Sequence, residues 1–132
     1  MSVPVDLDRV AEEMRKYSFA YLMTSTADGR PHAVAVSPVI DGNHLVVNGA
    51  GNTTRANARE RPAVALVWPP AGIEEYSLIV DGDAQVDGET VTVTSTRAVL
   101  HRPAPAPEGA PGSSCGSDCV PLESTPLEGA EV

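Results

Sequence analysis

The sequence predicts a mainly β protein with short helices, built as an antiparallel barrel or sandwich. About six apolar segments of strand length follow one another, which is typical of such folds. Asp-Gly pairs at Asp28-Gly29, Asp41-Gly42 and Asp87-Gly88 separate several of these segments and favour tight hairpin turns. Helical spacing of apolar or capping residues is confined to two short stretches.

The first half of the chain alternates a helix with three strands. Apolar residues at helical spacing after Asp6, a plausible N-cap, predict a helix over residues 6–17. Strands are then expected over residues 17–25, 32–40 and 44–48, with turns at 27–30 and 41–43. Because the three strands are consecutive and joined by short turns, we expect them to form an antiparallel meander.

The second half begins with a glycine-containing loop. Thr53 or Thr54 is predicted to cap a short helix that Pro62 ends. The continuous apolar run over residues 63–68 predicts a central strand. Another strand is expected over residues 77–86, and Asp81-Gly82 within it fits either a hairpin turn or a bulge. The pattern ends with a short strand at 91–94 and one helical turn over 96–101.

Composition divides the 132-residue chain into two parts. Residues 103–132 hold 6 of the 12 prolines, 4 of the 11 glycines, both cysteines and five acidic residues, without any Lys or Arg. The whole chain has a formal net charge of −9, so residues 1–102 carry −4. We therefore expect a domain over 1–102 followed by a Pro/Gly-rich acidic tail over 103–132.

Charge and hydropathy exclude several classes of function. An acidic chain is unsuited to nucleic acid or to an anionic membrane surface, both of which attract basic residues. The longest apolar run, residues 63–68, is far shorter than the roughly 20 residues of a membrane span. Acidic residues near the N-terminus interrupt the apolar stretch that a signal peptide needs. We therefore expect the protein in the cytoplasm, where its cysteines would be reduced.

The segment 48–57 is the first candidate site. A Gly-containing loop that enters a helix offers free backbone N–H groups to an anion, and Thr53, Thr54 and Arg55 add side-chain donors. Arg59 and Arg61 follow, which makes this stretch the main concentration of positive charge. The alternative is a capped helix with a solvated basic face.

Two further groups have both functional and ordinary interpretations. His32 has the chemistry of a general acid or base, but a lone histidine at the start of a strand is more often simply exposed. Cys115 and Cys119 fit a metal site with His101 or His44, a disulfide, or a pair of reduced thiols. Since a structural zinc site needs four ligands, we predict no metal site.

The order of these features resembles the pyridoxamine 5′-phosphate oxidase-like family over about residues 6–102. The similar segments are the helix 6–17, Met23-Thr24-Ser25, Asp28-Gly29, Pro31-His32, residues 46–62 and residues 80–86. The resemblance implies a six-stranded antiparallel split β-barrel of the flavin-binding type, with Asp81-Gly82 as a bulge. It also implies a homodimer with cofactor sites at the interface.

By this resemblance, the cofactor is FMN or, alternatively, a deazaflavin, with the phosphate held by Thr53, Thr54 and Arg55. Related short proteins of this kind also use haem. The complete set of implied cofactor-binding residues is His32, Val36, Ser37, Asn48, Gly49, Thr53, Thr54, Arg55 and Asn57. The expected function is an oxidoreductase acting on a small-molecule substrate or electron acceptor. The alternatives are a non-catalytic cofactor-binding protein for storage, sensing or sequestration, and a dimeric interaction module. The substrate-binding C-terminal segment of the vitamin B6 enzymes has no counterpart here.

Overall fold

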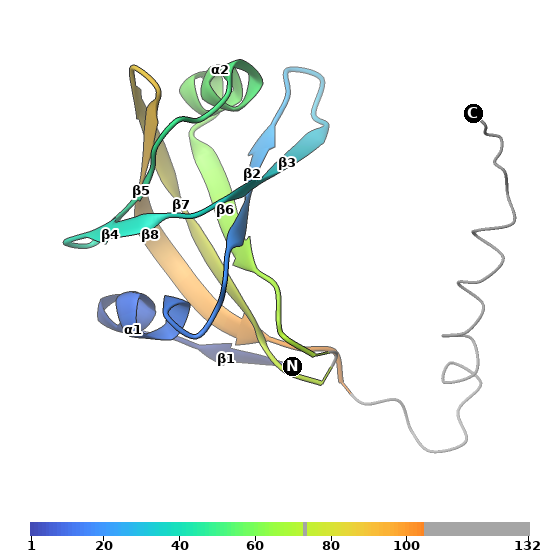
Figure 1. The fold of residues 1–132 in the computed structure, drawn as a ribbon. Coiled ribbons are helices and arrows are strands. Elements are labelled where there is room, and N and C mark those ends of the chain that lie inside the picture. The colour runs from blue at the N-terminus through green and yellow to red at the C-terminus, as the bar shows by residue number, and fades with distance from the viewer. Residues whose placement is uncertain (73, 105–132) are drawn as a thin grey trace, which may run out of the picture. The chain divides into compact units, whose positions relative to one another are not determined.

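A computed structural model describes residues 1–72 and 74–104, whose strands form one antiparallel sheet (Figure 1). Its eight strands are β1 (Ser2–Pro4), β2 (Ala20–Ser25), β3 (Pro31–Val36), β4 (Val39–Asp41), β5 (His44–Val47), β6 (Ala63–Trp68), β7 (Ser77–Asp87) and β8 (Thr90–His101). A 3-10 turn at Leu7–Arg9 leads into α1 (Val10–Met14), and α2 (Asn52–Glu60) follows β5. The predicted mainly β class with short helices is confirmed, with eight strands in place of six.

The sheet is curled and open. Its strand order is β3-β2-β6-β7-β8-β5-β4, and β1 pairs with the end of β8. The two outer strands of this order, β3 and β4, are consecutive in the chain and are joined by Ser37 and Pro38. Within the described residues no ladder connects β3 with β4, so the barrel is split between them.

The predicted single strand over residues 32–40 is therefore wrong. Pro38 has no N–H to donate and a fixed φ, which ends the ladder of β3 and lets the chain cross to the other side of the opening. The predicted meander is wrong for the same reason. The β2–β3 and β4–β5 hairpins form separately, and β5 pairs with β8.

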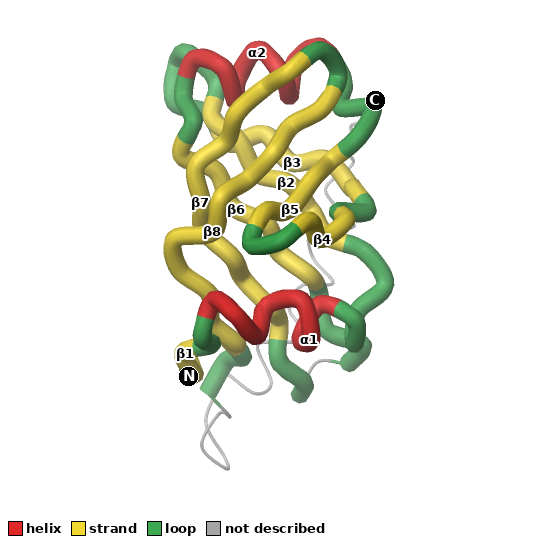
Figure 2. Tube along the Cα trace, turned by 90° about the vertical axis from the view of Figure 1, so that its left-hand side faces the viewer, coloured by secondary structure: helices red, strands yellow, loops and turns green. Residues whose placement is uncertain are grey.

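The helices lie at opposite ends of the strands (Figure 2). The expected helix over 6–17 is shorter, and the Asp6 side chain makes no capping hydrogen bond. At the other end, α2 contacts β2 and β7. Its N-cap is Gly51, so the prediction of a Thr53 or Thr54 cap is wrong: both threonines lie inside the first turn.

A bulge interrupts the long β7–β8 hairpin. Asp81 pairs with Arg97 and Gly82 pairs with Ser95, so that Thr96 is the extra residue of β8. The Thr96 hydroxyl donates to the carbonyl oxygen of Asp81 at 3.2 Å. The structure thus confirms the bulge. It also corrects the helical turn expected over 96–101, because pairing with both β7 and β1 keeps that segment extended.

Alternating side chains of the strands fill the barrel. The largest fully buried side chains are Trp68, Leu22, Leu45, Leu66, Leu78, Val80, Val91 and Val93. Thr24, Thr54 and Asn57 are buried polar residues at the end that α2 covers. The rest of the core is apolar, so these three residues make this end of the barrel chemically distinct. Their burial costs free energy unless they form hydrogen bonds.

The chain divides into two units, Met1–Arg102 and Pro103–Val132. Residues 105–132, and with them the predictions for Cys115 and Cys119, lie outside the described residues. Among residues 1–72 and 74–104, no helix is long and apolar enough to cross a membrane. The same residues contain no group of three or more His, Cys, Asp or Glu side chains arranged to hold a metal ion.

Candidate functional site

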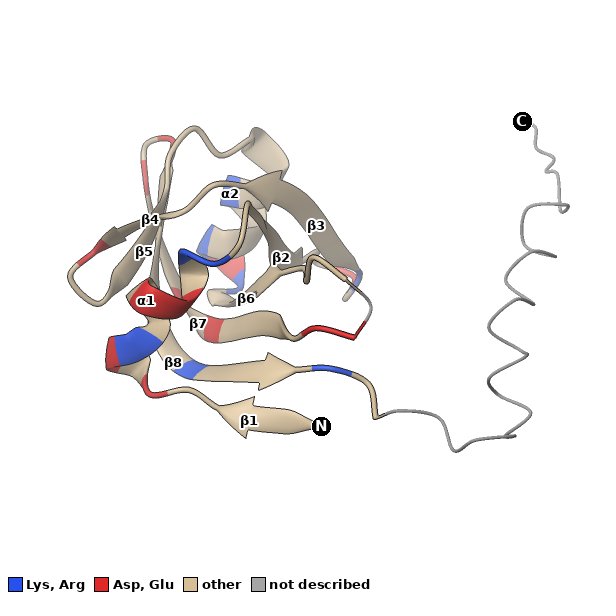
Figure 3. Cartoon of the chain, turned by 60° about the horizontal axis from the view of Figure 1, so that its bottom comes forward, with Lys and Arg blue, Asp and Glu red and all other residues tan. Residues whose placement is uncertain are grey.

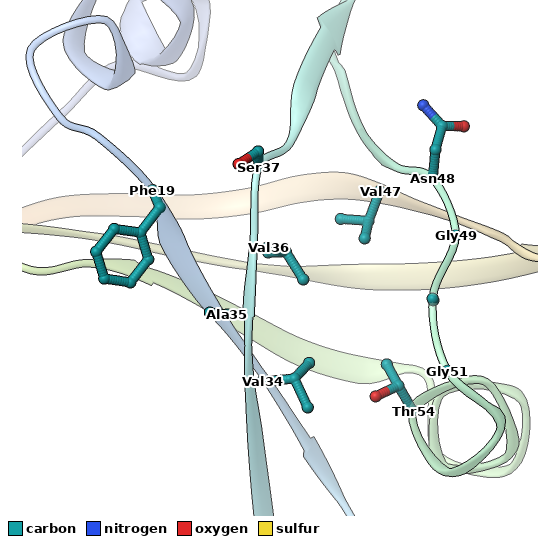
Figure 4. Close-up of a pocket in the computed structure, with 11 residues that line it drawn as sticks. Phe19, Val34, Ala35, Val36, Ser37, Val47, Asn48, Gly49, Gly51 and Thr54 are labelled. Atoms are coloured by element: carbon teal, nitrogen blue, oxygen red, sulfur yellow. The ribbon is translucent and has the colours of Figure 1, made fainter.

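A cavity of about 420 Å³ opens between β3 and the segment that runs from the end of β5 into α2 (Figure 4). This volume lies in the range of roughly 300–1,000 Å³ that is usual for small-molecule sites. The lining residues are Phe19, Val34, Ala35, Val36, Ser37, Val47, Asn48, Gly49, Ala50, Gly51 and Thr54. The cavity therefore occupies the place where the barrel is split.

The two walls of the cavity differ in chemistry. On one wall, Val34 and Val36 of β3 present aliphatic surface, and Val47 at the end of β5 lies across from them beside Asn48, as Figure 4 shows. The opposite wall contains Gly51, which is the N-cap of α2, and Thr54 of the first helical turn. The first N–H groups of a helix have no intrahelical acceptor and lie at the positive end of its dipole. The cavity suits a ligand with a flat apolar part and an anionic or acceptor-rich end.

Five of the nine predicted site residues line this cavity. They are Val36, Ser37, Asn48, Gly49 and Thr54, from β3, the loop after β5 and α2. His32, Thr53, Arg55 and Asn57 are not among the lining residues. Thr53 is exposed. The nine-residue set omitted six lining residues, although two of them, Ala50 and Gly51, lie within the candidate segment 48–57; the six are Phe19, Val34, Ala35, Val47, Ala50 and Gly51.

Arg55 is half-buried beside the cavity and its guanidinium contacts this chain's own acceptors. Nε donates to the carbonyl oxygen of Gly51 at 3.3 Å, and Nη1 donates to that of Gly88 at 3.3 Å. Nη2 also bonds the side-chain oxygen of Asn52. These contacts hold the positive charge near the N-terminal end of α2, next to the cavity rather than in its lining.

The other two arginines are not gathered at the cavity. Nε of Arg61 donates to the carbonyl oxygen of Ser25 at 2.8 Å, at the end of β2. Arg59 is exposed on α2. The three arginines expected to cluster are thus spread from the first turn of α2 to its C-cap, with Arg55 and Arg61 bound to backbone carbonyls at opposite ends of the helix.

Asn57 of α2 and His32 of β3 lie outside the cavity lining, and both are neighbours of Thr24 on β2. The Asn57 Nδ2 group donates to the Thr24 hydroxyl at 3.0 Å in a buried hydrogen bond. Thr24 is the cross-strand neighbour of His32. Nδ1 of His32 is buried and has no hydrogen-bond partner within the described part of the chain. His32 is on the same face of β3 as Val34, which lines the cavity.

We expect Asn57→Ala to lower the free energy of unfolding by about 1–3 kcal/mol, the range for leaving a buried polar partner unsatisfied. Denaturant unfolding followed by tryptophan fluorescence of Trp68 measures this loss. Thr53→Ala is the matched control, since Thr53 is an exposed residue of the same helix. Equal stability of the two variants would show that the Asn57–Thr24 bond does not hold α2 on the barrel.

Two groups with shifted pKa values lie outside the cavity. Burial raises the pKa of Tyr17, and the negative charges of Glu13 and Glu75 raise it further. The hydrogen bond from the Thr26 hydroxyl lowers the pKa of the exposed Asp28 carboxyl. Every lining side chain of the cavity is instead uncharged, so the site offers hydrogen bonds and apolar contact rather than acid or base groups.

Comparisons with known proteins agree with this architecture. No protein-family model matches the chain. The chain is 41% identical over 132 residues to uncharacterized proteins from Mycobacterium bovis and Mycobacterium tuberculosis, an alignment that covers 88% of this chain and 93% of each of them.

Solved structures share the fold at low sequence identity. A Listeria innocua protein assigned as a pyridoxamine 5′-phosphate oxidase has a TM-score of 0.57 and 14% identity, over 74% of this chain and 98% of that one. A Mycobacterium smegmatis FAD binding protein has a TM-score of 0.56 and 16% identity, over 75% of this chain and 97% of that one. The chain belongs to one family with the two mycobacterial proteins and has the split-barrel fold of the pyridoxamine 5′-phosphate oxidase-like proteins.

Proposed function

We propose that this protein is a homodimer that binds FMN, or a deazaflavin, in the cavity and acts as a cofactor-dependent oxidoreductase. The observation that carries the proposal is the cavity at the split of the barrel, with an aliphatic wall facing the N-terminus of α2. A protein with this fold from Mycobacterium smegmatis is described as FAD binding, which supports the same class of ligand.

The residues present fit such a ligand. Val34, Val36 and Val47 offer an apolar surface for a planar ring system. The N–H groups at the start of α2 and the Thr54 hydroxyl would receive a phosphate, with Arg55 one residue further along. Glycine at positions 49 and 51 leaves the backbone of this wall open to the ligand, because no Cβ covers it.

A bound flavin or deazaflavin supplies hydride acceptance and donation. The chain's residues bind the ring, orient it against β3 and reduce its contact with water. The lining holds no acidic or basic side chain, so the lining residues contribute position rather than proton transfer. The same observation favours a second candidate function, a binding protein that stores, senses or sequesters the cofactor without turnover.

Two measurements on the full chain test these functions. The absorbance spectrum and mass of any co-purified ligand, followed by titration with FMN, riboflavin and a deazaflavin, decide whether the cavity binds this class. Oxidation of a reduced nicotinamide by the loaded protein then separates an oxidoreductase from a storage protein. A chain that binds none of the three compounds contradicts both functions as proposed.

The outer face of the sheet supports the homodimer. The adjacent strands β3, β2 and β6 contain no Lys, Arg, Asp or Glu, and Figure 3 shows them without charged residues. Tyr21 is 40% and Met23 37% exposed on this face. Their cross-strand neighbours are the small apolar residues Ala35 and Ala33 on β3. A second copy is the natural cover for this face, because an uncharged apolar surface that a monomer leaves open marks an interface.

The apolar face reaches the cavity. Ala35 lies opposite Tyr21 on the outer face and also lines the cavity, and Phe19 packs edge-on against Tyr21 with ring centroids 5.2 Å apart. A partner on this face would therefore approach the open side of the cavity. In a dimer of this kind, the partner would complete a cavity that one protomer encloses only in part.

We expect Met23→Glu to convert the dimer to a monomer and to weaken FMN binding at least tenfold, because a carboxylate would be buried in an apolar contact. Sedimentation equilibrium and FMN titration measure the two effects. Val3→Glu is the control, since Val3 is 43% exposed on β1, which pairs with β8 and not with β3, β2 or β6. A Met23→Glu protein that keeps the wild-type mass would remove this face from the proposed interface.

A further inference from the structure

Two hydrogen bonds join the polar wall of the cavity, residues 48–51, to the turn between β7 and β8, and a third joins the adjacent Arg55 to the same turn. The Thr90 hydroxyl donates to the side-chain oxygen of Asn48 at 3.3 Å, and the Ala50 N–H donates to the carbonyl oxygen of Glu89 at 2.9 Å. The third bond is that from Arg55 to the carbonyl oxygen of Gly88. All three reach consecutive residues of one turn, 33 to 42 positions further along the chain.

The wall has few other means of holding its position. It runs from Asn48 to Gly51 without regular structure, and Gly49 has a φ of +71°. Glycines give a loop conformational freedom, which has to be removed by contacts from elsewhere. Asn48 and Ala50 both line the cavity and both bond the turn, so the turn is in direct contact with ligand-facing residues.

We propose that the β7–β8 turn, residues 87–90, is the positioning element of the cavity, with Gly88 and Thr90 as positioning residues. The proposal rests on the proposed function, since it assigns the turn to the binding of the flavin ligand. Thr90 acts through Asn48: its hydroxyl donates to the amide oxygen and thereby leaves the amide N–H groups as the free donors of that side chain. Gly88 acts through its φ of +62°, which sets the backbone shape of the turn.

The chain contains a matched pair of glycines for a test. Gly88 and Gly42 both have a φ of +62°, and a Cβ at either position would meet no atom within 4 Å. Alanine therefore imposes the same left-handed strain at both sites. Gly42 lies in the β4–β5 turn, at the far end of β5 from the cavity residue Val47. Only Gly88 is in the turn that bonds the wall.

The first experiment compares Gly88→Ala with Gly42→Ala in the full chain. We expect similar losses of thermal stability, but an increase in the FMN dissociation constant of about fivefold or more for Gly88→Ala alone. In the ligand-free protein, hydrogen exchange of the Ala50 amide is expected to accelerate in Gly88→Ala and to stay unchanged in Gly42→Ala. Equal exchange of Ala50 in the two variants, or equal FMN affinities, overturns the proposal.

A second pair of variants isolates one contact. Thr90→Val keeps the shape of the side chain and removes the donor, whereas Thr90→Ser keeps the donor. We expect Thr90→Val to weaken FMN and riboflavin by the same factor, about threefold, and Thr90→Ser to restore wild-type binding. A loss confined to FMN would place Thr90 with the phosphate and contradict its action through the wall. If the wild-type chain binds neither flavin, the proposed function fails, and the Ala50 exchange rates still decide whether the turn holds the wall.

Discussion

Gly82→Ala is expected to lower the free energy of unfolding by about 2–3 kcal/mol, a cost typical of forcing extra volume into a packed interior. A Cβ at this position would lie 2.5 Å from the carbonyl oxygen of Thr94 and 2.6 Å from a methyl group of Val93. The carbonyl belongs to the backbone of β8, so it cannot move aside as a flexible side chain would. Relief requires the two longest strands of the sheet to separate at the bulge.

Urea unfolding of the two-state type measures this loss. Gly72→Ala is the control, because a Cβ there meets only the flexible carboxylate of Glu75, at 3.7 Å. If Gly82→Ala and Gly72→Ala unfold at the same urea concentration, the close approach of β8 to Gly82 is not a feature of the folded protein. The bulge would then need another explanation.

Local features of the fold were predictable because their causes lie within a few residues. The turn at Asp41-Gly42 follows from a glycine that accepts a positive φ, which is +62° in the structure. The strand β6 follows from a continuous apolar run, and it has neighbours on both sides in the sheet. These predictions required no knowledge of the distant part of the chain.

The failures share a non-local cause. Residues 96–101 contain good helix formers, yet they extend β8 because β7 and β1 supply hydrogen-bond partners on both of its edges. The local pattern around Pro38 predicts a strand, but the flanking strands β3 and β4 lie at opposite edges of the sheet. Pairing partners that lie tens of residues away are not visible in a local pattern.

The candidate site shows the same division. Asn48, Gly49 and Thr54 were predictable, since a glycine-containing loop before a helix is itself the source of the donors. The direction of the Arg55 side chain was not, because its acceptor Gly88 lies 33 positions further along the chain. The sequence shows that Arg55 lies at the start of a helix, but the fold is needed to show which backbone carbonyls bind its guanidinium.

Competition between these carbonyls and a ligand phosphate makes Arg55 the sharpest test of the anion site. We expect Arg55→Ala to weaken FMN binding by about 1.5–3 kcal/mol, the value of a hydrogen bond to a charged group. The guanidinium bonds three uncharged acceptors, the carbonyl oxygens of Gly51 and Gly88 at 3.3 Å and the Asn52 side chain, and a charge-assisted bond to phosphate is stronger than bonds to such neutral groups. The 2.9 Å bond from Ala50 to Glu89 continues to hold the wall in that state.

Riboflavin, which lacks the phosphate, separates the two roles of Arg55 in the same titration. If Arg55 binds the phosphate, Arg55→Ala weakens FMN and spares riboflavin, and Arg55→Lys recovers most of the loss because it keeps the charge. If Arg55 serves only the wall, both ligands weaken equally and lysine recovers neither, since its single ammonium cannot bond Gly51 and Gly88 in the same fork. Unchanged FMN affinity in Arg55→Ala rejects both roles and leaves the phosphate to the backbone of α2.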